Sequence, residues 1–224
     1  MRQTGFFITG TDTGIGKTWA TLSLMRALRA RGLCVLGMKP VATGGVWREG
    51  RWVNKDALAL QAAASMAVPY EQVNPYVYEP PVSPHIAAAE AGRPVDIEYI
   101  VKIFKGLPAA DHVLVEGVGG WAVPLDGRKR VADLALALDL PVILVVGLRL
   151  GCLNHALLTQ AAMVSSGAEF AGWVANRIEP DFASAGQNID TLTREFAAPP
   201  LAVLPCGGLE PPLVPWRVSC PGPG

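Results

Sequence analysis

A glycine-rich segment near the start of the chain constrains its fold more than any other feature. Residues 10–18 read Gly-Thr-Asp-Thr-Gly-Ile-Gly-Lys-Thr, follow the apolar residues 5–9 and precede a helical pattern. This order predicts a strand, a tight turn and a helix N-terminus, where backbone N–H groups and the helix dipole converge on one point. Such a turn binds nucleotide phosphates, so we expect Lys17 on the β- and γ-phosphate oxygens and the Thr18 hydroxyl on Mg²⁺.

The spacing of this segment departs slightly from the usual phosphate loop. Counting back from Gly-Lys-Thr, Thr11 occupies the position of the first glycine, and Gly10 lies one residue earlier. Glycine-rich turns between a strand and a helix also occur for packing alone, but Gly-Lys-Thr in this context favours nucleotide binding. The residues assigned to the nucleotide phosphates are Thr13, Gly14, Ile15, Gly16, Lys17 and Thr18.

Apolar runs of strand length alternate with helical segments along the chain. Strands are expected at residues 6–9, 34–38, 113–116, 142–146, 172–175 and 201–204. Helices are expected at residues 17–31, 57–67, 85–91, 98–105, 131–138, 154–166 and 189–196. The alternation is typical of a doubly wound α/β fold of the phosphate-loop NTPase type, with a mostly parallel sheet. Because the strands are continuously apolar, we expect helices on both faces of that sheet.

Two segments interrupt this alternation. Residues 43–55 carry two tryptophans around Arg-Glu-Gly-Arg and predict a protruding loop or short hairpin. The last 22 residues contain six Pro, four Gly and two Cys, and prolines at this density exclude an ordinary helix. We therefore expect one domain over residues 1–205, which is long enough to bury a sizeable core, and an atypical, irregular tail over 206–224.

The composition excludes several classes of function. Lys plus Arg and Asp plus Glu number 19 each, so the chain lacks the basic excess of a nucleic-acid-binding protein. Its apolar stretches are shorter than the roughly 20 residues of a membrane span, and we expect no membrane partner. Four cysteines show neither CxxC spacing nor disulfide density, which favours reduced thiols in the cytoplasm. The three histidines add no zinc-ligand spacing.

Three charged residues are expected to meet the phosphate loop. Lys39 ends the second strand before a proline, and Glu116 ends the third strand before a glycine-rich turn. Because ligands bind beyond the carboxyl ends of parallel strands, both should converge on the same crevice. Lys39 would be a second cation, while Glu116 and Asp56 would join Thr18 around Mg²⁺, which prefers hard oxygen ligands. Asp56 also lies near a helix start, where it could serve as a plain cap.

A second glycine-containing turn follows the fourth strand. Residues 147–155 read Gly-Leu-Arg-Leu-Gly-Cys-Leu-Asn-His and join that strand to a helix. The free N–H groups at this helix start could bind a carboxylate. Most such turns bind nothing, so the segment alone is a weak signal.

Taken together, these residues resemble the dethiobiotin synthetase family. The similarity rests on seven segments, in family order, over roughly residues 5–205. These are Gly-Thr-Asp-Thr-Gly-Ile-Gly-Lys-Thr at 10–18, Lys-Pro-Val-Ala-Thr at 39–43, Asp-Ala-Leu-Ala-Leu-Gln at 56–61, Ser-Pro-His-Ile at 83–86, Glu-Gly-Val-Gly-Gly-Trp at 116–121, Leu-Gly-Cys-Leu-Asn-His at 150–155 and Gly-Trp-Val-Ala-Asn at 172–176. One such segment would be weak evidence for the family, but seven in the family's order are specific to it.

The resemblance implies an ATP-dependent ring closure. The substrates would be 7,8-diaminononanoate, CO₂ and ATP with Mg²⁺, and the products dethiobiotin, ADP and phosphate. One amine would take up CO₂ as a carbamate, whose oxygen attacks the γ-phosphate. The second amine would then close on the carbamic–phosphoric anhydride. Clustered cations and N–H donors would make the approach of several negative charges tolerable.

The resemblance also implies a role for each matching residue. Lys17 and Lys39 would be catalytic, and Thr18, Asp56 and Glu116 would hold Mg²⁺. Further ATP contacts would come from Gly117, Gly119, Asn176 and Pro205, with Asn176 on adenine. Thr11 and Thr43 would face the substrate. Family members are homodimers, in which the partner's turn, here Leu150, Gly151 and Asn154, receives the substrate carboxylate.

The chain departs from the family pattern at three places. Gly14 stands where many members have an acidic residue, and Asn188 stands near the position of a substrate-contacting tyrosine. After Pro205 the family motif gives way to the proline-rich tail, from which we expect weaker nucleotide selectivity.

Three alternatives remain open from the sequence. ATP-dependent amidoligases such as the cobyrinic acid diamide synthases share the fold, but they carry a glutaminase domain for which 224 residues leave no room. Switch ATPases that partition plasmids or position septa usually have an extra lysine early in the loop, and residues 11–15 contain none. An inactive homologue that binds nucleotide without turnover is the third.

Overall fold

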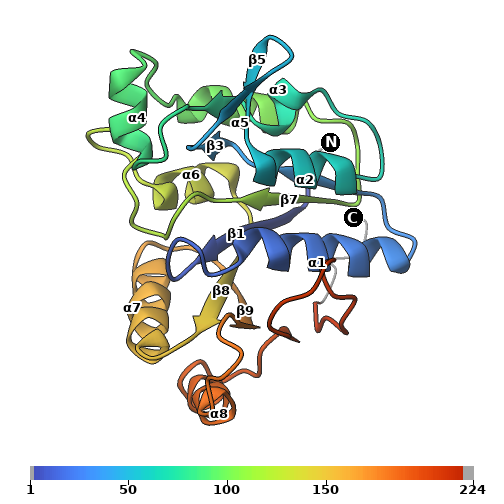
Figure 1. Ribbon diagram of the computed structural model, residues 1–224, viewed down its shortest axis with the longest axis vertical. Helices are drawn as coiled ribbons and strands as arrows, with labels where there is room; N and C mark the ends of the chain where they lie inside the picture. The colour runs from blue at the N-terminus through green and yellow to red at the C-terminus, as the bar shows by residue number, and fades with distance from the viewer. Residues whose placement is uncertain (1–2, 219–224) are drawn as a thin grey trace.

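The computed structural model describes residues 3–218 and contains a central sheet of six parallel strands. The strand order across the sheet is β10-β9-β8-β1-β7-β2, and helices lie on both sides of it (Figure 1). The strands are β1 (Gly5–Gly10), β2 (Val35–Met38), β7 (His112–Glu116), β8 (Val142–Leu148), β9 (Phe170–Arg177) and β10 (Ala202–Leu204). The doubly wound α/β fold and all six strands are confirmed.

The helices alternate with these strands, as the sequence predicts. They are α1 (Lys17–Ala30), α2 (Lys55–Ala63), α3 (Tyr70–Val73), α4 (Pro84–Glu90), α5 (Ile97–Lys105), α6 (Val131–Leu138), α7 (Cys152–Ser165) and α8 (Ala185–Glu195). Helix α2 ends short of the predicted residue 67, because the Ser65 N–H donates to the Val35 carbonyl at 2.8 Å instead of to a carbonyl of the helix. Among the helices of residues 3–218, none has both the length and the apolar character of a bilayer span.

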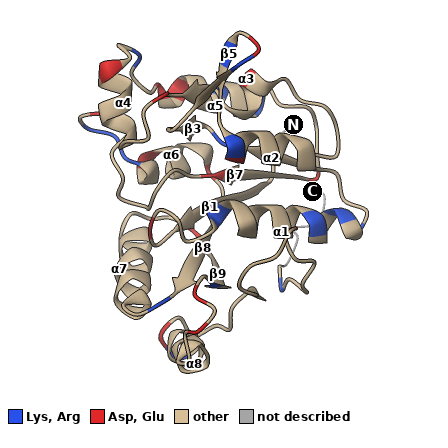
Figure 2. Ribbon diagram, in the orientation of Figure 1, with Lys and Arg blue, Asp and Glu red and all other residues tan. Residues whose placement is uncertain are grey.

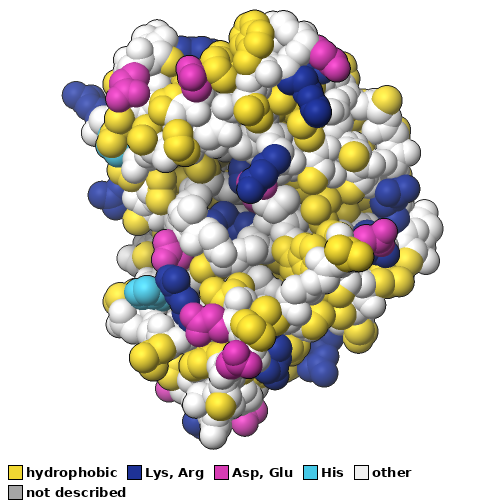
Figure 3. Space-filling view, in the orientation of Figure 1, with side chains coloured by type: hydrophobic (Ala, Val, Ile, Leu, Met, Phe, Trp, Pro, Cys, Tyr) yellow, Lys and Arg dark blue, Asp and Glu magenta, His cyan; other side chains and the backbone are white. Residues whose placement is uncertain are grey.

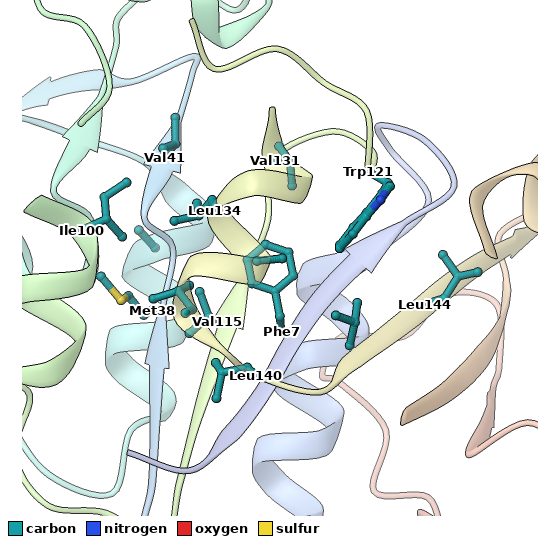
Figure 4. Packing of buried hydrophobic residues seen from close by; sticks show 14 of the residues in the cluster. Phe7, Met38, Val41, Ile100, Val115, Trp121, Val131, Leu134, Leu140 and Leu144 are labelled. Atoms are coloured by element: carbon teal, nitrogen blue, oxygen red, sulfur yellow. The ribbon is translucent and has the colours of Figure 1, made fainter. Parts of the chain in front are cut away.

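Two hydrophobic cores form because neighbouring strand residues point to opposite faces. Phe7 belongs to the larger core, which α5, α6, α7 and α8 cover. Figure 4 shows Phe7 and Val115 of the sheet packed against Val131 and Leu134 of α6. Phe6 and Ile8 belong to the second core, beneath α1. Packing on both faces fixes the sheet and therefore the positions of the turns at its carboxyl edge.

Two short accessory sheets lie beside the main one. Strands β3 (Val41–Ala42) and β6 (Tyr76–Val77) pair in parallel, and β4 (Val46–Arg48) and β5 (Arg51–Val53) form an antiparallel hairpin. The hairpin confirms the prediction for residues 43–55. Its cross-strand tryptophans, Trp47 and Trp52, pack edge to face, with their ring centroids 5.3 Å apart.

The tail beyond the last strand has no regular secondary structure as far as residue 218, as its prolines predict. It nevertheless packs on α1: the Ser23 hydroxyl donates to the Pro212 carbonyl at 2.6 Å and accepts from the Trp216 indole at 3.2 Å. Residues 219–224, with Cys220, lie outside the described residues. Within the described range Cys34, Cys152 and Cys206 are free thiols.

Candidate active site

The phosphate loop, the start of α2 and the end of β7 surround one pocket. In Figure 2, positions of basic and acidic residues on the ribbon lie close together where the N-terminal ends of α1 and α2 approach the end of β7. In the space-filling view this face is hollowed there (Figure 3). The pocket has a volume of about 360 Å³ and is lined by Thr13, Gly14, Gly16, Lys17, Thr18, Lys39, Ala42, Thr43, Asn54, Lys55, Asp56, Glu116, Val118 and Gly119.

The phosphate loop needs glycine where helix α1 begins. Gly16 caps α1 with φ 83° and ψ 35°, and the helix start has no side-chain cap. A Cβ atom at Gly16 would lie 2.2 Å from Nδ2 of Asn176, which donates to the Ile15 carbonyl at 2.8 Å. The first N–H groups of α1 are thus not used by a capping side chain, and they form an anion-binding end.

Lys17 is buried at the base of this loop, with only 7% of its surface exposed. Its Nζ donates to the Asp12 carbonyl at 2.8 Å. Burial and the nearby Lys39 ammonium lower the pKa of Lys17 to about 8. An ammonium with so little water around it is poised to gain from the arrival of a polyanion.

Lys39 brings a second buried cation from the end of β2. Its Nζ donates to Glu116 Oε1 at 2.5 Å and lies 3.5 Å from Asp56 Oδ2. Burial disfavours the charge on Lys39, but its ion pairs with Glu116 and Asp56 outweigh burial and raise its pKa. Lys39 is therefore a permanent cation, whereas Lys17 titrates.

The oxygens around Glu116 suit a hard divalent cation. The Thr18 hydroxyl donates to Glu116 Oε1 at 2.8 Å. The other oxygen, Oε2, is buried and has no hydrogen-bond partner among residues 3–218. A buried carboxylate oxygen without a partner is costly, and a bound cation would satisfy it. Together with Asp56, these residues supply the oxygen ligands that Mg²⁺ prefers.

Asp56 does not cap α2, contrary to one of the two roles considered for it. The cap is Asn54, whose side chain accepts from the N–H groups of Asp56 at 2.9 Å and Ala57 at 3.3 Å. The Asp56 carboxylate is therefore free of a capping role and lies beside the Lys39 ammonium. Asn54, Lys55 and Val118 line the pocket without having been singled out from the sequence. An Asn directly before a helical pattern is itself a cap signal, which could have identified Asn54.

A second hollow adjoins the other side of the phosphate loop. Its volume is about 260 Å³, and its lining is Gly14, Gly16, Trp19, Asn176, Arg177, Ile178, Pro205, Cys206, Gly207 and Gly208. The structure thus brings Asn176 and Pro205, from the ends of β9 and β10, to the loop. Trp19 is an aromatic wall that the sequence reasoning missed.

Other candidate residues lie away from these two hollows. Ile15 is buried in the core beneath α1, so only its backbone serves the loop. Gly117 is also buried, and a Cβ there would meet the Phe7 ring at 3.1 Å. Thr11 lines a neighbouring hollow with Thr13 and Trp121. Leu150 and Gly151 lie on an exposed turn, and Asn154 is exposed in the first turn of α7; none of the three is among the residues that line either hollow.

The chain is similar to known proteins over nearly its whole length. A family model described as an AAA domain matches residues 4–208. The ATP-dependent dethiobiotin synthetase BioD of Aromatoleum aromaticum is 49% identical, with 97% of each chain covered. That of Xanthomonas oryzae pv. oryzae is 47% identical, with 97% of this chain and 93% of the relative covered. The chain belongs to the dethiobiotin synthetase family.

Solved structures share the fold of this dethiobiotin synthetase family member. The MinC:MinD cell division complex of Aquifex aeolicus aligns with TM-score 0.55 and 18% identity, covering 91% of this chain and 82% of that one. A ParA family ATPase of Chlorobium tepidum aligns with TM-score 0.53 and 13% identity, covering 92% and 86%. At such identities the likeness concerns the fold alone, and it confirms the predicted fold class.

Proposed function

We propose that this chain converts 7,8-diaminononanoate, CO₂ and ATP into dethiobiotin, ADP and phosphate, as an ATP-dependent ligase of biotin biosynthesis. One observation carries the proposal at the level of the site. Two buried ammonium groups, Lys17 and Lys39, lie in one pocket with Glu116 and an open helix N-terminus. Such a pocket suits a reaction in which several negative charges must approach one another. The names of relatives that the chain covers almost completely supply the product, dethiobiotin, and the dependence on ATP.

The reaction proceeds through two intermediates. One amine of the substrate takes up CO₂ as a carbamate, and a carbamate oxygen attacks the γ-phosphorus of ATP while ADP leaves. The second amine then attacks the carbon of the carbamic–phosphoric anhydride, closes the ureido ring and expels phosphate. No nucleophilic side chain is needed. The protein contributes by holding the reactants together and by stabilising charge in the transition state.

The two lysines divide this work. Lys17 binds the β- and γ-phosphates together with the loop N–H groups. Lys39 faces the carbamate and the phosphoryl group in transfer. Because Lys39 is pinned between Glu116 and Asp56, its ammonium is positioned before the substrates arrive. This arrangement avoids the reorganisation that free water would require.

Mg²⁺ would be held by Thr18, Asp56 and Glu116. When bound, it would neutralise phosphate charge during the transfer. Thr11 and Thr43 would face the diamine. Asn176 and Pro205 would contact adenine beside the loop, with Gly119 on the phosphate side.

The exposed turn at Leu150, Gly151 and Asn154 would complete the substrate site of a second copy of the chain, in a cytoplasmic homodimer. The turn is exposed in a single chain, with 90% of the Leu150 surface free. Its free helix N–H groups suit the substrate carboxylate. We assign residues 1–205 to the catalytic domain and 206–224 to an accessory tail.

The proposal is tested by incubating the full chain with MgATP, the diamine and ¹³C-labelled bicarbonate. Mass spectrometry should find a cyclic urea that carries the label, and phosphate release should require both diamine and bicarbonate. ATP turnover indifferent to the diamine would instead favour a switch ATPase. Nucleotide binding without any turnover would identify an inactive homologue.

A further inference from the structure

Asp12, in the phosphate loop, accepts three hydrogen bonds, two with its carboxylate and one with its backbone carbonyl. Its Oδ1 accepts from the Thr13 N–H at 2.7 Å, and its carbonyl accepts from Lys17 Nζ at 2.8 Å. Its Oδ2 accepts from Arg149 Nη2 at 2.6 Å. The first two hydrogen bonds join residues of the loop, whereas the third joins the loop to Arg149, which lies after β8.

Arg149 is the first residue after β8, on the turn that leads into α7. Strands β1 and β8 are neighbours, with Gly10 opposite Val145, and the Thr11 N–H continues the pairing to the Val145 carbonyl at 3.1 Å. The two turns therefore leave the sheet side by side. Arg149 directly precedes Leu150 and Gly151, the turn assigned above to the substrate carboxylate of a second copy.

We propose that Asp12 and Arg149 are positioning residues, whose ion pair ties the phosphate loop to the β8–α7 turn. Because the Asp12 carbonyl receives Lys17, the place of this turn sets the place of the Lys17 ammonium. A shift of the turn on substrate binding would then reach the phosphates directly. This role in catalysis rests on the proposed function, whereas the effect on Lys17 does not.

The exposure of the pair argues against a role in global stability. The Arg149 and Asp12 side chains are 35% and 47% exposed, and ion pairs with this much water contribute little to folding. Variants should therefore fold. The Arg51–Glu71 pair offers a matched control, because it is equally short at 2.6 Å, is exposed and lies outside the pocket lining.

The hydrogen bonds give the proposal a distinctive signature. The Arg149 guanidinium donates to the Asp12 carboxylate, and the Asp12 carbonyl accepts from Lys17 Nζ, so one chain of contacts joins the three residues. Asp12→Asn and Arg149→Met should therefore displace the Lys17 ammonium in the same way, and their effects should not add. Independent loosening of the loop by each variant would instead give losses that multiply.

The experiment uses Asp12→Asn, Arg149→Met, the double variant, Arg149→Lys and the control Arg51→Met. Calorimetry measures the MgADP affinity of each. We expect both single variants to weaken MgADP binding, because the Lys17 ammonium is displaced from the phosphates. In turnover, each single variant should lower kcat by roughly tenfold with a smaller change in KM, as misplaced groups do. Arg149→Lys should recover most of the loss.

The double variant decides the matter. If the pair acts as one unit, its kcat should fall no further than that of the worse single variant. Losses that multiply, MgADP affinities unchanged in both single variants, or an equal effect from Arg51→Met would overturn the proposal. If the wild type forms no dethiobiotin but the two single variants and the double variant weaken MgADP binding equally, the positioning role stands and the proposed function fails.

Discussion

The turns after β1 and β8 are built alike but lie in different surroundings. Each joins a buried parallel strand to a helix through a left-handed glycine, Gly16 with φ 83° and Gly151 with φ 89°, and neither helix has a side-chain cap. Directly before Gly16, Ile15 is 1% exposed, whereas directly before Gly151, Leu150 is 90% exposed. The same local geometry thus gives a closed site in one place and an open one in the other.

The difference comes from the neighbouring strands. On one side of β1, β7 ends in Glu116 and β2 is followed by Lys39, and both side chains turn in under the loop. On the far side of β8, β9 ends in the exposed Arg177. A glycine turn therefore supplies free backbone N–H groups, and the charged side chains at the ends of neighbouring strands decide whether the turn becomes part of a buried site. In the proposed homodimer, the second turn would receive charges or backbone groups from the other copy of the chain.

The largest effect is expected from Lys39→Met. Removing a preorganised cation from the transfer step should lower kcat by about 10²–10³-fold. MgADP affinity should change far less, since Lys17 and the loop N–H groups remain. Single-turnover kinetics and calorimetry separate the two quantities.

Lys39→Met also leaves Glu116 with a buried, unpaired charge, so its folding must be checked by thermal unfolding. Lys39→Gln, which keeps a donor, is the companion variant. Equal losses in kcat and in ADP affinity would show that Lys39 merely binds nucleotide, and the contrast between the two lysines would disappear.

A smaller effect is expected from Leu150→Asp on the open turn. A carboxylate placed there should repel the substrate carboxylate and raise KM for the diamine by about tenfold or more, with ATP binding unchanged. Leu150→Asn, uncharged and of similar shape, is the control. The side chain is 90% exposed, so folding should be unaffected.

Mixing the two variants tests whether the open turn serves a second copy. In a homodimer with shared sites, equal amounts of Lys39→Met and Leu150→Asp, assayed at a diamine concentration far below KM, should recover about a quarter of wild-type activity. Half of the dimers are then mixed, and each mixed dimer has one intact site. Activity that stays at the mean of the two parents would mean that the turn serves its own chain.

Gly16→Ala and Gly151→Ala compare the turns by stability. Both positions have positive φ, which costs a non-glycine residue about 1–2 kcal/mol. At Gly151 nothing lies within 4 Å of the added Cβ, whereas at Gly16 Asn176 Nδ2 lies at 2.2 Å. Gly16→Ala should therefore cost roughly 1–3 kcal/mol more in the free energy of unfolding, measured with denaturant. Equal costs would mean that Asn176 moves aside easily and does not brace the loop.

The sequence predicts the framework of the site because parallel strands bring their carboxyl ends to one edge. Lys39 and Glu116 could be placed at that edge from strand ends alone. The pairing of Lys39 with Asp56 could not, because it depends on how α2 packs on β2 and α1. The helix cap at Asn54 could also be predicted, because an Asn lies directly before the helical pattern, but the cap role was considered for Asp56 instead. The Asp12–Arg149 pair joins residues 137 apart in the chain, and no local pattern announces it.

The smallest effect, on proton uptake, tests the closed turn most directly. With its pKa lowered to about 8, Lys17 is half neutral near that pH in the free protein, and bound phosphates favour the charged form. MgADP binding should therefore take up a proton increasingly from about pH 7.5 to 9.5, and affinity should fall over the same range. Lys39, whose pKa is raised, stays charged and adds nothing. Removing its like charge in Lys39→Met should move the onset of uptake to higher pH, while Leu150→Asp should leave it in place. If MgADP binds without proton uptake at all of these pH values, Lys17 is already charged in the free protein. Burial then does not lower the pKa of Lys17, and the closed turn does not differ from the open one in titration.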